Sequence, residues 1–280
     1  MRWQLLSLFL ALATPAVAQD QTLIGGTPAN PAAWPASVYA KAGGAACSAA
    51  VVADQTVLIA AHCVDDQKSI TFSVGPNQYA AKCTHSPDYR GDSTADWALC
   101  KVTKKVVGVP YESLVTDGGW CAKGKKVRLT GYGCVKEGGG GGNDGVYRIG
   151  QSDVTTCPSR NNDTVTKGGA ALCFGDSGGP AFVEFADGSR QLFGVNSRGD
   201  IKETSYLSSV WTAKAKSFFA GWQATNNQVL CGWPGATGCR GGTNPPPPPP
   251  PPPPPKPTLC AAEKVGASAS IAALLKCLDP

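Results

Sequence analysis

The chain has 280 residues, of which 42% are hydrophobic and 16% are charged, and it contains 12 cysteines. This composition predicts a globular protein with a sizeable core and excludes disorder as the default. The formal net charge of +5 is modest, and the lysines are too dispersed to predict a nucleic-acid partner.

The first 18 residues have the pattern of a secretory signal peptide. Arg2 supplies the positive start, residues 5–13 form an apolar stretch too short to span a bilayer, and Ala16-Val17-Ala18 is an A-x-A cleavage site. No later stretch reaches transmembrane length. We therefore expect a secreted, extracellular protein without a membrane span, whose even number of cysteines can form disulfides.

The central part of the chain predicts short β-strands. The strand candidates are rich in β-branched and apolar residues and are bounded by turn-forming residues. No long stretch with a period of 3.6 interrupts the strands before residue 115, which favours a sandwich or a barrel. The predicted strands cover residues 37–40, 49–52, 57–60, 70–74, 98–102, 127–133 and 192–199.

Two features of the second half fall in predicted loops. The unbroken glycine run at 138–142 predicts a flexible loop over residues 136–145. Asn162-Asp163-Thr164 is a glycosylation sequon, which has meaning only in a host that glycosylates exported proteins.

The composition changes again after residue 209. Residues 210–224 predict a helix that packs one apolar face, formed by Trp211, Ala215, Phe218 and Trp222, against the core. Residues 241–257 form a proline-rich linker, for which we expect the polyproline II conformation. Residues 258–280 are too short for a normal core. A solvated tail and a module that tethers the protein to a surface or matrix both remain open for this segment.

A serine lies between glycines in Gly175-Asp176-Ser177-Gly178-Gly179-Pro180. Glycine allows a sharp turn and a close approach to a ligand, so the Ser177 hydroxyl is presented. The N–H groups of Gly175 and Ser177 can then point at one spot. Two such donors are what a developing oxyanion requires.

A serine hydroxyl is a weak nucleophile until a base accepts its proton, and a third group must orient that base. The chain has two histidines. His62 follows an apolar run within A-A-H-C, and Asp96 lies within A-D-W-A-L. His85 lies in H-S-P-D-Y, for which we expect a structural role.

Several motifs, in this order, resemble the chymotrypsin/trypsin family of serine endopeptidases. They are L-I-G-G from residue 23, the Cys47-to-Cys63 stretch ending in A-A-H-C, D-W-A-L from residue 96, T-G-Y-G from residue 130, and G-D-S-G-G-P from residue 175. The resemblance covers roughly residues 23–222.

The resemblance implies an all-β fold of two packed, antiparallel six-stranded β-barrels with a C-terminal α-helix. The peptidase domain would cover residues 23–240, with barrel one at about 24–115, barrel two at about 116–209 and the helix at about 210–224. It also implies a disulfide between Cys47 and Cys63, beside the catalytic histidine.

The resemblance further implies a mechanism for hydrolysing peptide bonds in protein or peptide substrates. Ser177 would be the nucleophile, His62 the base and Asp96 its orienting group, with Gly175 and Ser177 forming the oxyanion hole. An acyl-enzyme forms, and no metal or organic cofactor is required. The alternative is a catalytically silent, protease-like module kept for binding or adhesion.

Activation in the family follows cleavage just before the L-I-G-G-like motif. Residues 19–22 would be a very short propeptide, and the new amino group of Leu23 would pair with Asp176. Thr22 stands where the family usually has Arg or Lys. We therefore expect activation by a non-tryptic protease or by the protein itself.

The resemblance also locates specificity residues. Ala171 stands where a trypsin-like enzyme has Asp, so cleavage after Lys or Arg is not expected. Gly199 leaves the pocket wall open and Thr204 partly fills it, which favours small to medium apolar residues. Ser197 matches a serine that hydrogen-bonds the catalytic Asp. Arg198 replaces an aromatic residue, and two interpretations stay open: a solvated edge charge, or a preference for acidic groups.

Spacing along the chain suggests that the other cysteines pair with their neighbours. Cys173 matches a family cysteine whose usual partner near residues 200–203 is missing, so we expect that loop to be rebuilt. The pairs suggested by spacing are Cys83–Cys100, Cys121–Cys134, Cys157–Cys173, Cys231–Cys239 and Cys260–Cys277.

Overall fold

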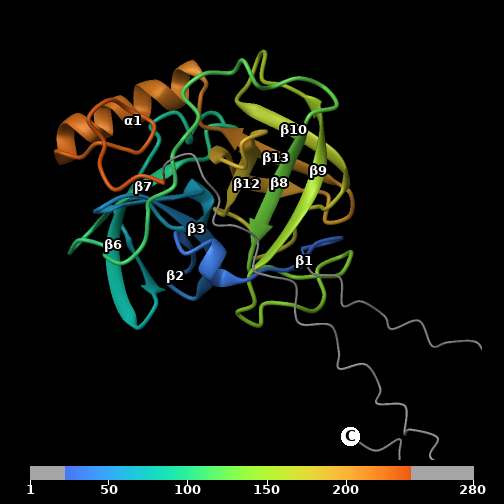
Figure 1. Ribbon diagram of the computed structural model, residues 1–280, viewed down its shortest axis with the longest axis horizontal. Coiled ribbons are helices and arrows are strands. Elements are labelled where there is room, and N and C mark those ends of the chain that lie inside the picture. The colour runs from blue at the N-terminus through green and yellow to red at the C-terminus, as the bar shows by residue number, and fades with distance from the viewer. Residues whose placement is uncertain (1–22, 241–280) are drawn as a thin grey trace, which may run out of the picture. The chain divides into compact units, whose positions relative to one another are not determined.

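The computed structural model describes residues 23–240 as two β-barrels followed by a helix (Figure 1). The predictions that lie outside the described residues are the signal peptide (1–18), the propeptide (19–22), the linker (241–257), the C-terminal segment (258–280) and the Cys260–Cys277 disulfide.

The first barrel is a closed sheet of six antiparallel strands in the order β2-β3-β4-β7-β6-β5. Its core forms because side chains alternate across each strand, as in β5, where every second residue is buried. The strands are β2 (Ser37–Ala42), β3 (Ala45–Ala53), β4 (Thr56–Ile59), β5 (Ser69–Val74), β6 (Asn77–His85) and β7 (Ala98–Val102).

The second barrel has the strand order β9-β10-β13-β12-β11-β8 and closes through β8 pairing with β9. The short strand β1 (Thr27–Pro28) adds to β9, so the start of the described chain belongs to this barrel. The barrel strands are β8 (Lys126–Gly131), β9 (Arg148–Thr156), β10 (Asp163–Gly169), β11 (Pro180–Glu184), β12 (Arg190–Gly199) and β13 (Thr204–Ser209).

The predicted fold of two six-stranded barrels is confirmed, and each predicted strand overlaps an observed one. The sequence analysis missed β1, β6, β9, β10, β11 and β13. Several of these strands carry many polar residues, as in R-I-G-Q-S-D-V-T-T of β9. Their strand structure comes from pairing with neighbours on both sides rather than from their own apolar content.

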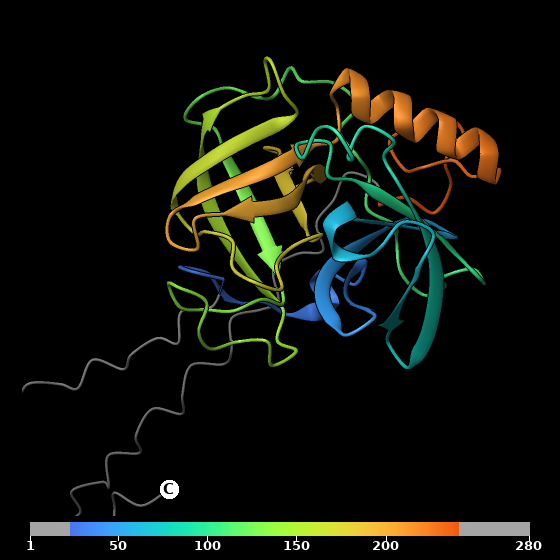
Figure 2. The ribbon, with the colours of Figure 1, turned by 180° about the vertical axis from the view of Figure 1, so that it is seen from behind.

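The helix α1 (Ala213–Asn226) lies beside the first barrel in both ribbon views (Figures 1 and 2). Thr212 caps its start by accepting a hydrogen bond from Ala215 N. Phe219, which the sequence analysis missed, is buried and packs edge-on against Trp97 of the first barrel. Trp211 precedes the helix and contacts Phe193 of the second barrel instead, so placing it on the helical face was wrong. Within residues 23–240, no helix is long and apolar enough to cross a membrane.

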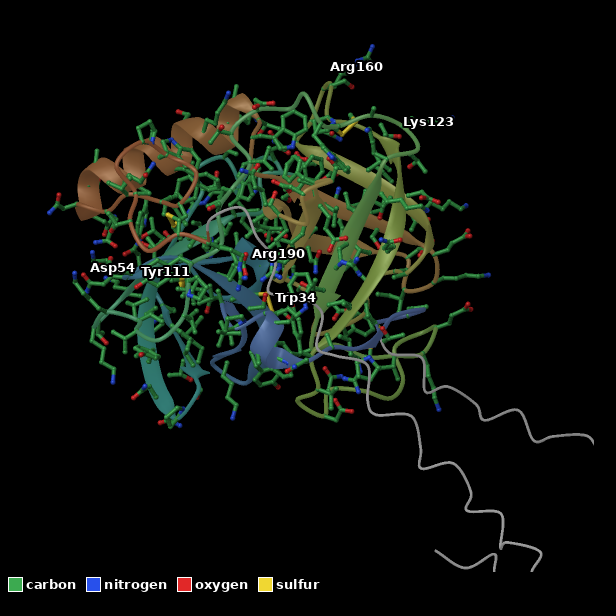
Figure 3. The ribbon with its side chains drawn as sticks, viewed as in Figure 1. Trp34, Asp54, Tyr111, Lys123, Arg160 and Arg190 are labelled. Atoms are coloured by element: carbon green, nitrogen blue, oxygen red, sulfur yellow. A yellow bond between two sulfur atoms is a disulfide. The ribbon has the colours of Figure 1, made fainter. Side chains whose placement is uncertain are left out.

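A buried ion network joins three distant segments. The Glu112 carboxylate is 0% exposed and accepts hydrogen bonds from Arg190 Nη2 at 2.5 Å and Nε at 3.2 Å. Arg240 Nε lies 3.4 Å from the same carboxylate. The Arg190 guanidinium also stacks over the Trp34 ring, 3.7 Å from its centre. Figure 3 labels both residues. The network therefore ties Arg240, at the end of the described residues, to Arg190 of the second barrel and to the segment that precedes β2.

We expect Glu112→Ala to lower the free energy of unfolding by about 3–5 kcal/mol, because it removes the buried carboxylate that two guanidinium groups contact. Asp153→Ala is the control. It breaks the exposed Lys126–Asp153 ion pair and should cost less than about 1 kcal/mol. Urea unfolding of both variants tests this, and equal losses would contradict it.

Candidate active site

The residues singled out from the motifs meet in one cleft between the barrels. His62 lies on the short 3-10 helix η2 (Ala61–Cys63), Asp96 just before β7, and Ser177 just before β11. The cleft has a volume of about 400 Å³, and its other lining residues include Leu172, Phe174, Arg198 and Ile201.

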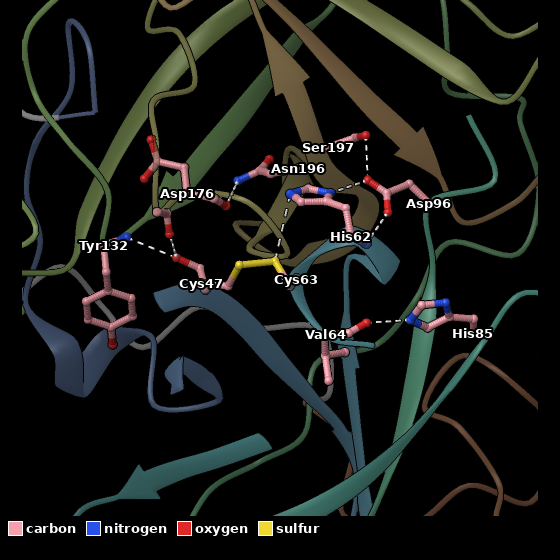
Figure 4. Close-up of a disulfide and its surroundings, with 12 residues drawn as sticks. Cys47, His62, Cys63, Val64, His85, Asp96, Tyr132, Asp176, Asn196 and Ser197 are labelled. Carbon is pink, nitrogen blue, oxygen red and sulfur yellow. Dashed lines mark hydrogen bonds and ion pairs between the residues drawn. A yellow bond between two sulfur atoms is a disulfide. The ribbon is translucent and has the colours of Figure 1, made fainter. Parts of the chain in front are cut away.

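Asp96 is buried and holds His62 from two sides. Its Oδ2 lies 2.7 Å from His62 Nδ1, and its Oδ1 accepts a hydrogen bond from His62 N at 3.0 Å (Figure 4). Ser197 Oγ donates to the same Oδ2 at 2.7 Å. A carboxylate at Nδ1 favours the tautomer that carries its proton there. Nε2 is then available as a base.

Nε2 of His62 faces the Cys47–Cys63 disulfide, 3.9 Å from Cys63 Sγ (Figure 4). Within the described part of the chain, no hydrogen bond joins Nε2 to the Ser177 hydroxyl. Catalytic hydrogen bonds are often long in unliganded enzymes and shorten when substrate binds. Cys47, His62 and Cys63 also gather closely enough to suggest metal ligands. The two sulfurs are bonded to each other, however, so they are not thiolate ligands.

His85 lies outside the cleft, as the sequence analysis expected of a structural residue. Its Nε2 lies 2.6 Å from the Val64 carbonyl oxygen (Figure 4), and its ring packs edge-on against Tyr89. The contact with Val64 supports the chain just after η2.

Asn162 supports the loop that leads to Asp96, a role the sequence analysis missed. Its Nδ2 donates to Asp92 Oδ2 at 3.2 Å and to Thr94 Oγ1 at 3.1 Å. Its Oδ1 accepts a hydrogen bond from Thr212 Oγ1 at 2.8 Å. Asn162 is only 4% exposed, so in the folded protein its sequon is not accessible for glycosylation.

The backbone beside Ser177 presents two free donors. Within residues 23–240, neither Gly175 N nor Ser177 N donates a hydrogen bond. Gly175 has a φ of +98°, and a Cβ there would lie 2.6 Å from Asn143 Oδ1. A side chain is therefore excluded at this turn.

Asp176 is fully buried, with one hydrogen bond to each carboxylate oxygen. Gly133 N donates to Oδ1 at 2.9 Å, and Cys173 N donates to Oδ2 at 2.9 Å. Burial raises the pKa of Asp176 to about 7 despite these two donors. Leu23 is buried in the second barrel, and Ile24 O accepts a hydrogen bond from Ala171 N. No hydrogen bond joins Leu23 to Asp176 in the described chain.

The predicted disulfides Cys47–Cys63, Cys83–Cys100 and Cys231–Cys239 are confirmed. The pairs Cys121–Cys134 and Cys157–Cys173 were wrong, because the structure joins Cys121 to Cys157 and Cys134 to Cys173. Barrel closure brings together cysteines that are not neighbours in sequence. Cys134 follows β8, and Cys173 lies in the loop that leads to Ser177.

The loop after β12 is closed by Asp200 in place of a disulfide. Asp200 Oδ1 accepts hydrogen bonds from the backbone N–H groups of Lys202, Glu203 and Thr204 at 2.8–3.0 Å. Partial burial acts to raise the pKa of Asp200, but these donors outweigh it and lower the pKa to about 2. The expectation that this loop is rebuilt agrees with that arrangement.

Of the expected specificity residues, Ser197, Arg198 and Gly199 line the cleft, whereas Ala171 and Thr204 do not. Ala171 is 0% exposed and clusters with Ile24 and the Cys134–Cys173 disulfide, with Ile201 packed against them. A Cβ at Gly199 would lie 2.7 Å from the Thr204 carbonyl oxygen, so the wall there carries no side chain. The side chain at position 171 offers no charge to pair with a basic substrate group.

Arg198 lines the cleft, but its charge already has a partner. Its guanidinium forms an ion pair with Asp163 and lies 4.8 Å from the centre of the Tyr206 ring. Burial raises the pKa of Asp163 above its usual value, although Arg198 acts to lower it. The Arg198 charge is therefore paired within the protein. It is neither a freely solvated edge charge nor an unpaired cation available to an acidic substrate group.

The two closed barrels, with a C-terminal helix and a cleft between them, define a chymotrypsin-like fold. The trypsin family profile matches residues 23–218. A trypsin-like protease of Streptomyces glaucescens is 30% identical over 224 residues, which cover 70% of this chain and 79% of that protein. The human chymotrypsin-like elastase family member 1 is 29% identical over 214 residues, which cover 62% of this chain and 80% of that protein. The chain belongs to the trypsin family and is a serine-type endopeptidase.

The pKa of Asp176 makes the stability of the full-length chain depend on pH. The folded chain keeps a proton up to a pH of about 7, whereas an unfolded Asp loses it near pH 4. The contribution of Asp176 therefore falls between these pH values, by on the order of 4 kcal/mol. Asp176→Asn should remove this slope. Urea unfolding of both chains from pH 4 to 8 tests this, and parallel pH profiles would contradict it.

Proposed function

We propose that this protein is a secreted serine endopeptidase that hydrolyses peptide bonds through a His62-Asp96-Ser177 triad. The observation that carries the proposal is the buried Asp96 carboxylate 2.7 Å from His62 Nδ1, in the same cleft as Ser177. A carboxylate in that position orients the base and stabilises the imidazolium that forms during the reaction.

In the proposed mechanism, Ser177 Oγ attacks the peptide carbonyl carbon while His62 Nε2 accepts its proton. The carbonyl oxygen becomes an oxyanion that the N–H groups of Gly175 and Ser177 hold. The tetrahedral intermediate collapses, His62 returns the proton to the leaving amine, and an acyl-enzyme remains. Water then repeats the sequence and releases the acid, so the serine is restored. No step needs a metal or an organic cofactor.

The proposed substrate preference is for small to medium apolar residues before the cleaved bond. The uncharged side chain at position 171, and Gly199 in the cleft lining, where a glycine adds no side chain, support this preference. A preference for acidic groups through Arg198 has less support, because that guanidinium is already paired with Asp163.

We also propose that cleavage after Thr22 activates the protein. The new amino group of Leu23 would give Asp176 a cationic partner and keep its carboxylate ionised. Support comes from the buried position of Leu23 in the second barrel and from the raised pKa of Asp176 in the uncleaved chain. The activating protease would be non-tryptic, or the protein itself.

Secretion is supported by the disulfides of the described chain, which persist in oxidising compartments. The tether through residues 258–280 rests on the sequence alone. Loss of retention on cells or matrix when residues 245–280 are deleted would support it.

The test of the triad is labelling with a fluorophosphonate probe, read by intact mass. We expect one adduct on the native protein and none on Ser177→Ala, together with a loss of kcat on the order of a millionfold, as in a triad enzyme of unrelated fold. Ser159→Ala, at an exposed serine, is the control and should label like the native protein. A native protein that starts at Leu23 and takes no adduct would favour the silent binding module.

A second test measures kcat/KM on a peptide library varied at the residue before the cleaved bond. Ala, Val and Leu should exceed Lys and Arg by at least about a hundredfold, because burying an unpaired cation beside Ala171 costs about 3 kcal/mol or more. Comparable values for Lys would show that another group pairs with the cation and would reject the proposed pocket.

A further inference from the structure

The direction of each oxyanion donor depends on the carbonyl of its own peptide group. In a trans peptide the C=O and N–H bonds point in opposite directions, and residues 23–240 contain no cis peptide bond. Holding the carbonyl on one side of the loop therefore aims the N–H at the other side.

Both relevant carbonyls are held from within the protein. The Phe174 carbonyl, which shares its peptide with Gly175 N–H, accepts a hydrogen bond from Cys134 N at 2.8 Å. The Asp176 carbonyl, which shares its peptide with Ser177 N–H, accepts one from Gly179 N at 3.0 Å. It accepts a second from the side chain of Asn196, whose Nδ2 lies 3.2 Å away, as Figure 4 draws.

An asparagine at position 196 lowers the stability of the folded protein. It lies on β12, is 0% exposed, and its Nδ2 also donates to the Thr130 carbonyl at 2.8 Å. Its Oδ1 is buried and has no hydrogen-bond partner among the described residues. A buried polar atom without a partner lowers stability. The amide therefore costs stability at its oxygen while its nitrogen holds the peptide next to Ser177.

We propose that Asn196 is a positioning residue of the oxyanion hole, which aims the Ser177 N–H into the cleft by binding the Asp176 carbonyl. The inference rests on the proposed function, because it takes the Ser177 N–H as a donor to the oxyanion. Asn196 itself touches neither the substrate nor the reacting atoms. The backbone of Asn196 brackets the same turn, since its N donates to Gly179 O and its O accepts from Gly178 N. Replacing the side chain leaves those bonds available.

The experiment compares Asn196→Val and Asn196→Ser with the native protein, using rates per fluorophosphonate-titrated active site so that misfolded molecules do not count. We expect kcat for an amide substrate to fall about ten- to hundredfold in both variants, below the effect of deleting an oxyanion donor. KM should stay within about twofold. The melting temperature of Asn196→Val should change by only a few degrees, because removing the unpaired Oδ1 offsets the loss of the donor to the Thr130 carbonyl.

Thr155→Val is the matched control. It removes a side-chain donor to a backbone carbonyl, that of Val165, within the same barrel but away from the oxyanion loop. It should leave kcat unchanged. A boronate inhibitor, which mimics the tetrahedral intermediate, should lose affinity for both Asn196 variants in parallel with kcat.

Values of kcat within twofold of the native protein in both variants would overturn the proposal, and so would an equal fall in Thr155→Val. Failure of both variants to fold would assign Asn196 a purely structural role and would also overturn it. If the native protein takes no probe, the proposed function fails instead. The two failures are therefore distinguishable.

Discussion

The loop of residues 174–177 is held by hydrogen bonds to the carbonyl oxygens of its own peptide groups. Because a peptide group is planar, each such bond fixes the direction of the following N–H. The donors come from both barrels, so the loop depends on their packing. Cys134 N donates to the carbonyl of residue 174, and Ser48 Oγ donates to that of residue 175. The carbonyl of residue 176 accepts from both Gly179 N and Asn196 Nδ2, and Ser48 N donates to the carbonyl of residue 177.

A buried carboxylate lies at the centre of this loop. Asp176 is surrounded so closely that a Cβ at Gly133 would lie 2.6 Å from its backbone nitrogen. Its raised pKa indicates that two N–H donors do not replace the lost hydration of a full negative charge. The proposed amino group of Leu23 would supply the missing charge. Peptide geometry and buried electrostatics thus act on the same turn.

The position of Asp96 also depends on contacts from several segments that are distant in the sequence. Ser197 donates to it from the second barrel, whereas His62 lies in the first barrel between β4 and β5. The preceding loop is held through Asn162, at the entrance to β10, and through Thr212 at the start of the helix. The carboxylate is therefore positioned by the whole domain rather than by its own loop.

The sequence by itself determined several strands, because these depend on local signals, and it supplied the motifs whose resemblance to the trypsin family predicted the barrels and the catalytic candidates. A-A-H-C, D-W-A-L and G-D-S-G-G-P can each be read within a few residues. Only the tertiary structure decided that Cys134 pairs with Cys173, that the sequon residue Asn162 is buried, and that Asn196 reaches the Asp176 carbonyl. Each of these contacts joins segments that barrel closure brings together, and no local pattern encodes the distance between them.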